Sequence, residues 1–302
     1  MRLRQESTWS GRRPWSIAAC CASAAPTRGP FLQGLISNDV TKVTPERAIY
    51  ATLLTAQGRF LHDFFIAERD GELLLEVEQT RREDLRKRLS LYKLRSKVTI
   101  EPLDALAVAA FWPGEALPQL GLPHETGTVI PLAGGVAFVD PRLAALGARA
   151  ILPRDRVEAA LAGFARGKLA DYDRHRRHLG VPDGGHDLVV EKSILLENGI
   201  DELNGVDWQK GCYIGQELTA RTKYRALIKK RLLPVAIEGA LPEPGTPVML
   251  GEREAGEMRS AADGIGLALL RLELLDAAAL EGETLRAGDA RLTVQRPDWM
   301  KF

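Results

Sequence analysis

The sequence has few cysteines, no long hydrophobic run and almost no net charge. Its three cysteines include the neighbours Cys20 and Cys21, so they cannot form a secreted disulfide framework, and we expect a reducing compartment. No apolar run approaches the roughly 20 residues that cross a bilayer, and no membrane association is expected. The 41 basic and 40 acidic residues leave a formal charge of +1, which gives no indication of a nucleic-acid partner.

Motifs of several common enzyme classes are also missing. The chain has no P-loop, no G-x-G-x-x-G after a predicted strand and no G-x-S-x-G elbow. Its cysteines and five histidines lack zinc-type spacing, so we expect no intrinsic metal. His175 and His178 lie three apart on a predicted helix, and we interpret them as part of a solvated basic face.

What is present is the composition of a globular protein. With 302 residues, 45% hydrophobic and 27% charged, the chain is long enough for two or three domains. Residues 1–28 are rich in Arg and Ser with a single acid, Glu6, and show no apolar alternation typical of a strand. We predict an atypical N-terminal segment that is a candidate for disorder. A transit peptide is an alternative interpretation.

The remaining pattern predicts an α+β fold in three further parts. Residues 50–77 read as an antiparallel meander, and residues 80–95 as a helix with Leu85, Leu89, Tyr92 and Leu94 on one face. A long helix is predicted over residues 154–180, and short runs after residue 229 are typical of a small β-barrel. The predicted domains are 29–110, 111–228 and 229–302.

Cys212 stands alone in the stretch KGCYIGQE at 210–217. A reactive cysteine needs a thiolate, which a nearby cation or a helix N-terminus stabilises. Lys210 precedes it by two residues, and the residues after it are predicted to begin a helix. The flanking Gly211 and Gly215 permit tight turns and close approach of a ligand. The alternative is an inert buried cysteine, and the local sequence leaves both open.

Polar residues also cluster at predicted corners. The clusters are Ser37, Asn38 and Asp39; Gln57, Gly58 and Arg59; Glu197 and Asn198; and Gln216 and Glu217. Such corners are common in turns and helix caps. Amides and carboxylates can also converge on a polar heterocycle and bind its donor and acceptor edge. Spacing alone does not choose between these roles.

Five blocks resemble the YgfZ/GcvT-like folate-binding family, and the resemblance runs in order over about residues 31–302, with the barrel end matching only in character. They are FLQGLISNDV at 31–40, LLTAQGRFLHDFFI at 53–66, LYKLRSKV at 91–98, HRRHLGVPDG at 175–184 and KGCYIGQELTAR at 210–221. The last block resembles the signature that separates YgfZ-type proteins from the glycine-cleavage aminomethyltransferase, the T-protein. The longer phrase LLENGIDELNGVDWQKGCYIGQELTAR resembles iron–sulfur assembly factors of the Iba type.

This resemblance implies an aminomethyltransferase-like fold of three parts around a central channel, with a small C-terminal β-barrel. It implies tetrahydrofolate or a derivative as the cofactor, and a role in assembling or repairing [4Fe–4S] proteins, including under oxidative stress. Iron–sulfur client or carrier proteins would be the partners. We expect a monomer in the cytoplasm, or in the mitochondrial matrix if the source is eukaryotic, without turnover chemistry of a standard enzyme.

The family's functional positions transfer to this chain as follows. Cys212 is implied as the functional thiol and a candidate shared cluster ligand, within a motif of Lys210, Gly211, Tyr213, Gly215, Gln216, Glu217 and Arg221. The folate-binding positions are implied to be Asn38, Asp39, Gln57, Arg59, Glu197 and Tyr213, with Glu197 facing the pterin.

Other functions on the same fold stay open. An aminomethyltransferase would need a carboxylate beside the folate, for which Asp39 or Asp63 is available. A folate-binding scaffold without chemistry would keep the channel residues and dispense with Cys212. A demethylase would need a further oxidative domain, which the sequence does not contain.

Overall fold

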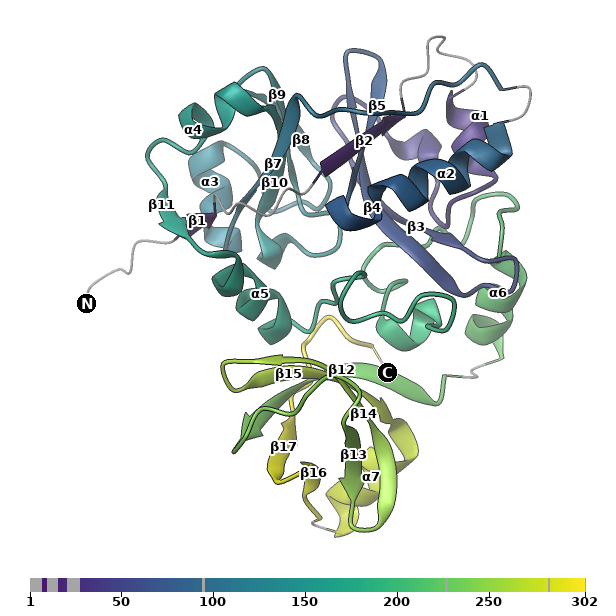
Figure 1. Cartoon of the computed structure of the whole chain (residues 1–302), viewed down its shortest axis with the longest axis vertical. Helices are drawn as coiled ribbons and strands as arrows, with labels where there is room; N and C mark the ends of the chain where they lie inside the picture. The colour runs from purple at the N-terminus through teal and green to yellow at the C-terminus, as the bar shows by residue number, and fades with distance from the viewer. Residues whose placement is uncertain are drawn as a thin grey trace. The chain divides into compact units, whose positions relative to one another are not determined.

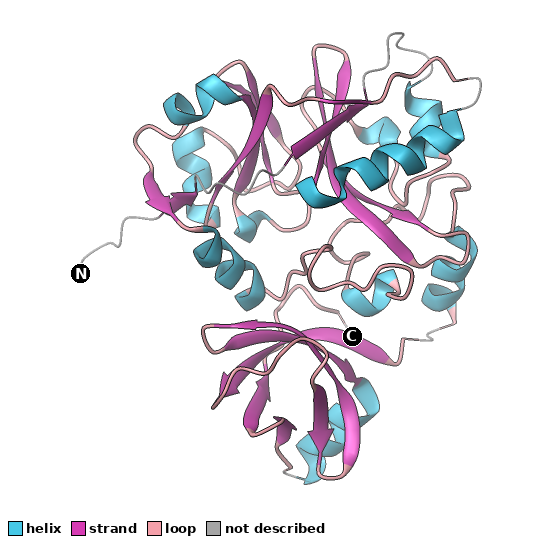
Figure 2. Ribbon diagram, in the orientation of Figure 1, coloured by secondary structure: helices cyan, strands magenta, loops and turns pink. Residues whose placement is uncertain are grey.

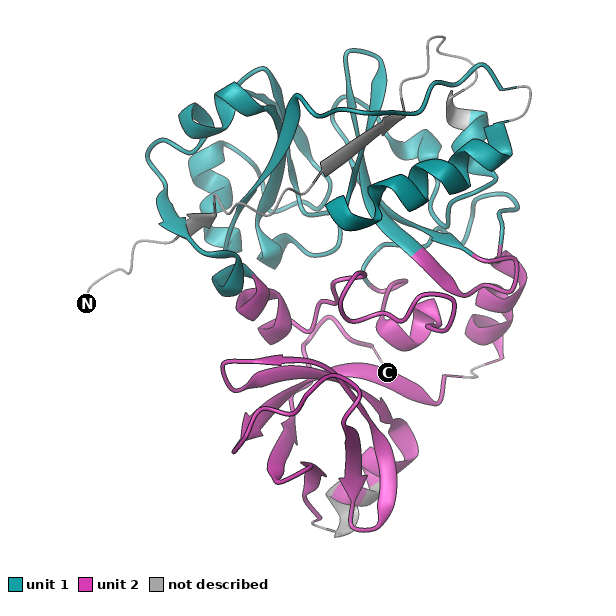
Figure 3. Cartoon of the chain, viewed as in Figure 1, with its two compact units in different colours: residues 1–54, 62–172, 203–214 teal, residues 55–61, 173–202, 215–302 magenta. Residues whose placement is uncertain are grey.

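The structure, a computed structural model, divides the chain into two compact units (Figure 3). It describes residues 7–9, 16–20, 28–93, 96–225, 228–281 and 283–301. Unit 1 comprises Met1–Leu54, His62–Tyr172 and Leu203–Ile214, and unit 2 comprises Thr55–Leu61, Asp173–Glu202 and Gly215–Phe302. Among the described residues, no helix is both long and apolar enough to span a membrane.

A five-stranded sheet in the order β3-β4-β5-β2-β6 carries the predicted meander (Figure 1). Its strands are β2 (Ser16–Cys20), β3 (Ile49–Leu54), β4 (Phe60–Arg69), β5 (Glu72–Val77) and β6 (Glu101–Pro102). The turn between the antiparallel β4 and β5 places Asp70 at φ 53° and Gly71 at φ 79°. Two left-handed residues form the turn that matches strand twist, so the Asp-Gly signal is confirmed.

A second sheet follows, in the order β11-β1-β7-β10-β9-β8. Its strands are β1 (Ser7–Trp9), β7 (Leu106–Phe111), β8 (Val129–Leu132), β9 (Gly135–Val139), β10 (Ala148–Pro153) and β11 (Ala165–Gly167). Both sheets are accompanied by helices (Figure 2). These are α1 (Arg28–Gln33), α2 (Arg82–Lys93), α3 (Leu117–Leu120), α4 (Val157–Ala160) and α5 (Leu169–His178), with short 3₁₀ turns at Val40–Lys42, Gln79–Arg81, Gly114–Ala116, Ala144–Leu146 and Arg154–Arg156.

The expectation that residues 1–28 contain no strand is wrong for two short stretches. The backbone of β1 pairs with β7 and β11, and that of β2 pairs with β5 and β6. Strand formation here follows from ladder pairing with neighbouring strands, which apolar alternation does not report. The rest of the predicted atypical segment lies outside the described residues.

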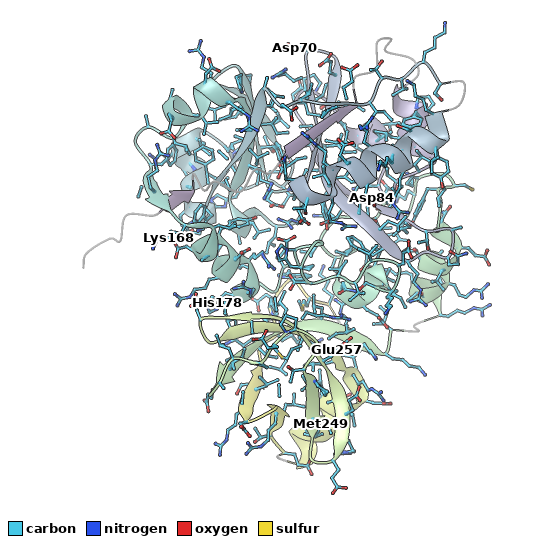
Figure 4. All side chains as sticks on the ribbon, viewed as in Figure 1. Asp70, Asp84, Lys168, His178, Met249 and Glu257 are labelled. Atoms are coloured by element: carbon cyan, nitrogen blue, oxygen red, sulfur yellow. The ribbon has the colours of Figure 1, made fainter. Side chains whose placement is uncertain are left out.

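The helix predicted over residues 80–95 is confirmed as α2, which lies across the five-stranded sheet (Figure 1). Leu85 and Leu89 are fully buried, whereas Tyr92 is exposed, so its assignment to the apolar face is wrong. Leu94 lies outside the described residues. Asp84, labelled on α2 in Figure 4, lies 2.8 Å from Nε2 of the buried His62 on β4. Burial lowers the pKa of His62 to about 4, so the ring is neutral and donates this bond at neutral pH.

The long helix predicted over residues 154–180 is also wrong. Helix α4 ends at Ala160, Gly163 adopts a φ of 87°, and β11 separates α4 from α5. Phe164, which the prediction placed in this helix, packs edge-on against Phe111 at 4.9 Å between ring centroids. A left-handed glycine and a sheet-edge pairing thus override the helical periodicity.

Buried charges join the two sheets inside unit 1. Arg149 on β10 donates from Nε to both carboxylate oxygens of Glu76 on β5, at 2.9 and 3.0 Å, and both residues are almost fully buried. Arg149 Nη1 donates to the hydroxyl of Tyr172 at 3.0 Å. The guanidinium also lies 4.5 Å from the ring centroid of Phe65. The network is neutral overall because Asp140 and Arg142 form a second bidentate pair beside it.

Unit 2 contains the predicted β-barrel. Six strands close in the order β12-β15-β14-β13-β16-β17. They are β12 (Lys230–Glu238), β13 (Pro247–Leu250), β14 (Arg253–Ala262), β15 (Ile265–Arg271), β16 (Leu285–Ala287) and β17 (Ala290–Val294). Helix α7 (Leu272–Glu281) follows β15, and α6 (Gln216–Tyr224) and the 3₁₀ turn Leu195–Asn198 complete the unit. The α+β class and the terminal barrel are thereby confirmed.

We expect Arg149→Met to lower the free energy of unfolding by about 3–5 kcal/mol, because it leaves the Glu76 carboxylate buried and unpaired. The double variant Glu76→Leu/Arg149→Met should recover most of this loss in urea unfolding. Arg86→Met, which breaks an exposed pair with Glu83, is the matched control and should change stability by less than about 1 kcal/mol. Equal losses in the single and double variants would contradict a charge effect.

Candidate functional site

The KGCYIGQE motif forms a loop that leads into α6. Cys212 is exposed and Tyr213 is buried, so the inert buried cysteine is excluded by the structure. The expected helix begins at Gln216, directly after Gly215 in a left-handed conformation with φ 84°. The motif changes unit between Ile214 and Gly215.

Lys210 anchors the base of this loop. Its Nζ donates three hydrogen bonds to backbone carbonyl oxygens: Gln33 at 2.8 Å, Ile36 at 2.6 Å and Asn38 at 2.7 Å. An ammonium has three N–H groups, so all of them are used and none is left for the Cys212 thiolate. Lys210 therefore fixes the base of the loop and does not hydrogen-bond the thiol.

The ammonium group of Lys210 interacts with the ring of Tyr213 and with the carboxylates of Asp39 and Asp207. Nζ lies 5.1 Å from the ring centroid of Tyr213, a cation–π contact. Burial lowers the pKa of Lys210 to about 8, although Asp39 and Asp207 act in the opposite direction. The backbone N–H of Ile214 donates to Gly34 O at 3.1 Å. The loop is thus held on both sides of Cys212, while the thiol itself stays accessible.

The remaining motif residues form the start of α6. A Cβ at Gly58 would lie 2.8 Å from Gly215 O and 2.9 Å from Leu218 Cβ, so the 55–59 turn packs directly on this helix start. Glu217 and Arg221 form an exposed i,i+4 ion pair at 2.8 Å. Such a pair contributes little to stability, and both side chains are available at the surface.

The corner at Asn38 and Asp39 is used for local structure. Asn38 Nδ2 donates to Tyr50 O and Asn204 O, both at 2.8 Å, and its Oδ1 accepts the Asp39 N–H at 2.7 Å. Asp39 Oδ1 caps the following 3₁₀ turn through the N–H and hydroxyl of Thr41, at 2.9 and 2.7 Å. Burial alone would raise the pKa of Asp39, but these bonds lower it.

Asn38 forms part of a cavity of about 340 Å³ that lies entirely within unit 1. The cavity is lined by Asn38, Lys42, Arg47, Ala48, Ile49, Tyr50, Thr126, Pro141, Asn204, Val206, Asp207, Trp208 and Gln209. Asp39 and Tyr213 are not in this lining. Lys42 pairs with Asp207 at 2.5 Å, and the side chains of Lys42 and Arg47 are both about half exposed.

Several lining residues were not identified from the sequence. Tyr50 is fully buried and its hydroxyl donates to Asp63 Oδ2 at 2.9 Å, which fixes a half-buried carboxylate. Asn204 donates from Nδ2 to Pro141 O at 2.9 Å. Asn204 and Trp208 stand in the phrase ELNGVDWQ, whose polar corner next to the motif was the available signal.

The other predicted folate residues belong to unit 2. Gln57 is exposed in the 55–59 turn, and Arg59 Nη1 donates to Lys192 O at 3.0 Å. Glu197 is half buried in the turn Leu195–Asn198. Burial raises the pKa of its carboxyl even though Lys230, Arg59 and Arg259 favour the charged form. Such a carboxyl, raised in pKa and surrounded by cations, is typical of a binding or proton-transfer group.

The described residues contain no cluster of three or more His, Cys, Asp or Glu able to hold a metal. His178 lies at the end of α5, labelled in Figure 4, and His175 is on the same helix. Within the part of the chain that the structure describes, Cys212 therefore belongs to no such group.

We expect Lys210→Met to lower the free energy of unfolding by about 3 kcal/mol at neutral pH, because carbonyls at the end of α1 lose their charged donor. The folded pKa of about 8 lies below the value of 10.5 for an ordinary lysine. Between pH 8 and pH 10.5 the unfolded state binds more protons than the folded state does. The free energy of unfolding of wild type should therefore rise with pH over this range. Urea unfolding across this pH range should show the rise in unfolding free energy in wild type only. An equal rise in Lys210→Met would contradict the assignment of the effect to Lys210.

Two comparisons concern the fold. Residues 229–302 match the family model of the CAF17 C-terminal β-barrel domain. The glycine cleavage system aminomethyltransferase T from Bartonella henselae superposes with a TM-score of 0.73, covering 94% of this chain and 84% of that chain at 15% sequence identity. The predicted aminomethyltransferase-like fold is confirmed, and at this identity the likeness concerns the fold alone.

Other relatives are similar in sequence. The mitochondrial iron–sulfur cluster assembly factor IBA57 of Mus musculus is 36% identical over 296 residues, which cover 91% of this chain and 81% of the relative. The Homo sapiens protein of the same name is 36% identical over 295 residues, with the same coverage. A Neurospora crassa homolog is 32% identical over 305 residues and is covered over 70% of its length. The resemblance to Iba-type proteins is thereby confirmed, and the chain belongs to the IBA57 family.

Proposed function

We propose that this chain is an iron–sulfur cluster assembly factor that binds tetrahydrofolate and presents Cys212 to a cluster held by a partner protein. The observation that carries the proposal is an exposed cysteine on a loop whose base is fixed by Lys210. Family membership supports the assembly role, since two relatives that are 36% identical carry that name.

Cys212 acts in this proposal as a thiolate. It loses its proton to solvent and ligates an iron of a cluster that a carrier protein delivers as substrate, with the partner supplying the remaining ligands. The fixed loop base limits the conformations of the thiol and lowers the entropic cost of this contact. Clients are iron–sulfur proteins of the [4Fe–4S] kind.

The unit 1 cavity is compatible with part of a folate. A pteridine offers a flat aromatic face and an edge of donors and acceptors, and Tyr50, Trp208, Asn204 and Gln209 supply matching rings and amides. Lys42 and Arg47 would suit the carboxylates of the glutamyl tail. Tetrahydrofolate would supply a one-carbon acceptor when bound, and these side chains would orient it.

Glu197 in unit 2 is proposed, from the family resemblance, as a hydrogen-bonding residue for a folate. Burial raises the pKa of the Glu197 carboxyl, and Lys230, Arg59 and Arg259 act in the opposite direction. Asp39 and Tyr213 would act indirectly, because Asp39 caps a turn and Tyr213 packs on Lys210.

The relatives are mitochondrial by name, which supports the mitochondrial alternative over the cytoplasm.

We expect Cys212→Ser to abolish rescue of a [4Fe–4S] enzyme in cells that lack the endogenous factor, because a hydroxyl is a poor cluster ligand. The measurement is the enzyme's specific activity, with protein level checked by immunoblot. The matched control is Cys20→Ser/Cys21→Ser, the same chemistry at the other two cysteines, which should keep rescue near wild type. Full rescue by Cys212→Ser would contradict a thiol-based role and favour a scaffold.

A tetrahydrofolate titration followed by tryptophan fluorescence separates the cofactor from the thiol. We expect Cys212→Ser to bind like wild type, since Cys212 does not line the cavity. Trp208→Phe should lose most of the fluorescence change, and Asn204→Ala should weaken binding about tenfold. No binding by wild type would contradict the folate proposal and leave the cluster proposal standing.

An aminomethyltransferase is the second candidate, supported by the Asp63 carboxylate that Tyr50 orients. Formation of methylene-tetrahydrofolate from an aminomethylated carrier, lost in Asp63→Asn, would favour it over the cluster role.

A further inference from the structure

Residues 295–301, which follow the last barrel strand, form a segment that we call the strap. The strap is attached to the barrel: Gln295 N–H donates to Pro234 O at 2.8 Å, and Met300 packs within the barrel core with 6% of its surface exposed. A turn between them is closed by Met300 N–H donating to Pro297 O at 3.0 Å.

The strap also contacts the segment that carries Glu197, within unit 2. A Cβ at Gly199 would lie 3.1 Å from Cη2 of Trp299, so the indole packs directly on the residue that ends the Glu197 turn. Trp299 Nε1 donates to Leu179 O at 2.7 Å, and Lys301 N–H donates to Glu202 Oε1 at 2.6 Å. The strap therefore contacts this segment at Gly199 and Glu202, and it is also bound to Leu179 after α5.

Arg231 on β12 fixes the same turn from the barrel wall. It is 2% exposed, its Nη1 donates to Leu196 O at 2.7 Å, and its Nη2 pairs with Glu202. Leu196 immediately precedes Glu197. The turn ends at Gly199 with φ 68°, and Asn198 Nδ2 donates back to Ile194 O at 2.8 Å. With both ends of the turn fixed, the backbone of Glu197 has little freedom.

We propose that Trp299 and Arg231 are positioning residues that hold the Glu197 carboxyl half buried, as a hydrogen-bonding group for a pterin-type heterocycle. The positioning rests on contacts within unit 2, and only the identity of the ligand rests on the proposed function. Lys230, Arg59 and Arg259 supply the positive field around this carboxyl.

The electrostatics of Glu197 agree with this role. Three nearby cations favour the ionised form, yet burial outweighs them and raises the pKa. The degree of burial is set by how closely the turn packs, and the indole over Gly199 is part of that packing. Loss of the indole would admit water and lower the pKa toward the ordinary value.

The test is the pKa of Glu197 in the full chain, measured by NMR titration of ¹³C-labelled glutamate carboxyls and assigned by the resonance missing in Glu197→Gln. We expect Trp299→Ala to lower this pKa and to weaken tetrahydrofolate binding about tenfold. Trp299→Phe shortens the ring and removes the atoms nearest Gly199, so it should lower this pKa in the same direction by a smaller amount. Gln295→Ala, a neutral change on the same strap that keeps its backbone bond, should alter neither quantity.

A folded Trp299→Ala with an unchanged Glu197 pKa would overturn the proposal. If Trp299→Ala does not fold, Gly199→Ala decides, because its methyl group would press on the indole at a left-handed position, and an unchanged pKa there overturns the proposal equally. If wild type binds no tetrahydrofolate, the folate part of the proposed function fails, while the pKa comparison still decides the positioning.

Discussion

The neutralisation of Arg149 by Glu76 is the constraint on which unit 1 depends. A charge removed from water must be matched by an opposite charge and hydrogen bonds, or folding becomes unfavourable. Because one partner stands on β5 and the other on β10, the pair can form only when both sheets have the correct register. Arg142 lies beside it, 5.5 Å from the ring centroid of Tyr50. The wall of the cavity is thus fixed by the same charges that join the sheets.

The thiol loop combines a fixed base with an accessible tip. Lys210 uses every N–H of its ammonium on carbonyls, a role that a shorter or uncharged side chain cannot perform. Cys212, two residues later, has no structural role comparable to that of Lys210. This division explains how one short motif can supply both rigidity and an exposed ligand.

Much of the fold and of the candidate site could be predicted from the sequence. The remaining features depend on tertiary contacts. The Asp-Gly turn, the barrel and the start of α6 follow from local chemistry, and the motif itself identified Cys212. The carbonyl acceptors of Lys210 lie in a segment far away along the chain, so spacing could not reveal them. Tyr50 reads as an ordinary strand residue, and only the structure pairs it with Asp63. The strands β1 and β2 depend on neighbours that the alternation of residues does not report.

The contact between Gly58 and Gly215 has a mechanical consequence. Because Gly58 has no side chain, the Gly215 carbonyl and the Leu218 side chain pack directly against its backbone, and packed interiors deform little. A push on the first turn of α6 must therefore move the turn that bears Gln57 and Arg59. Two blocks that are remote along the chain thus form one packed contact within unit 2.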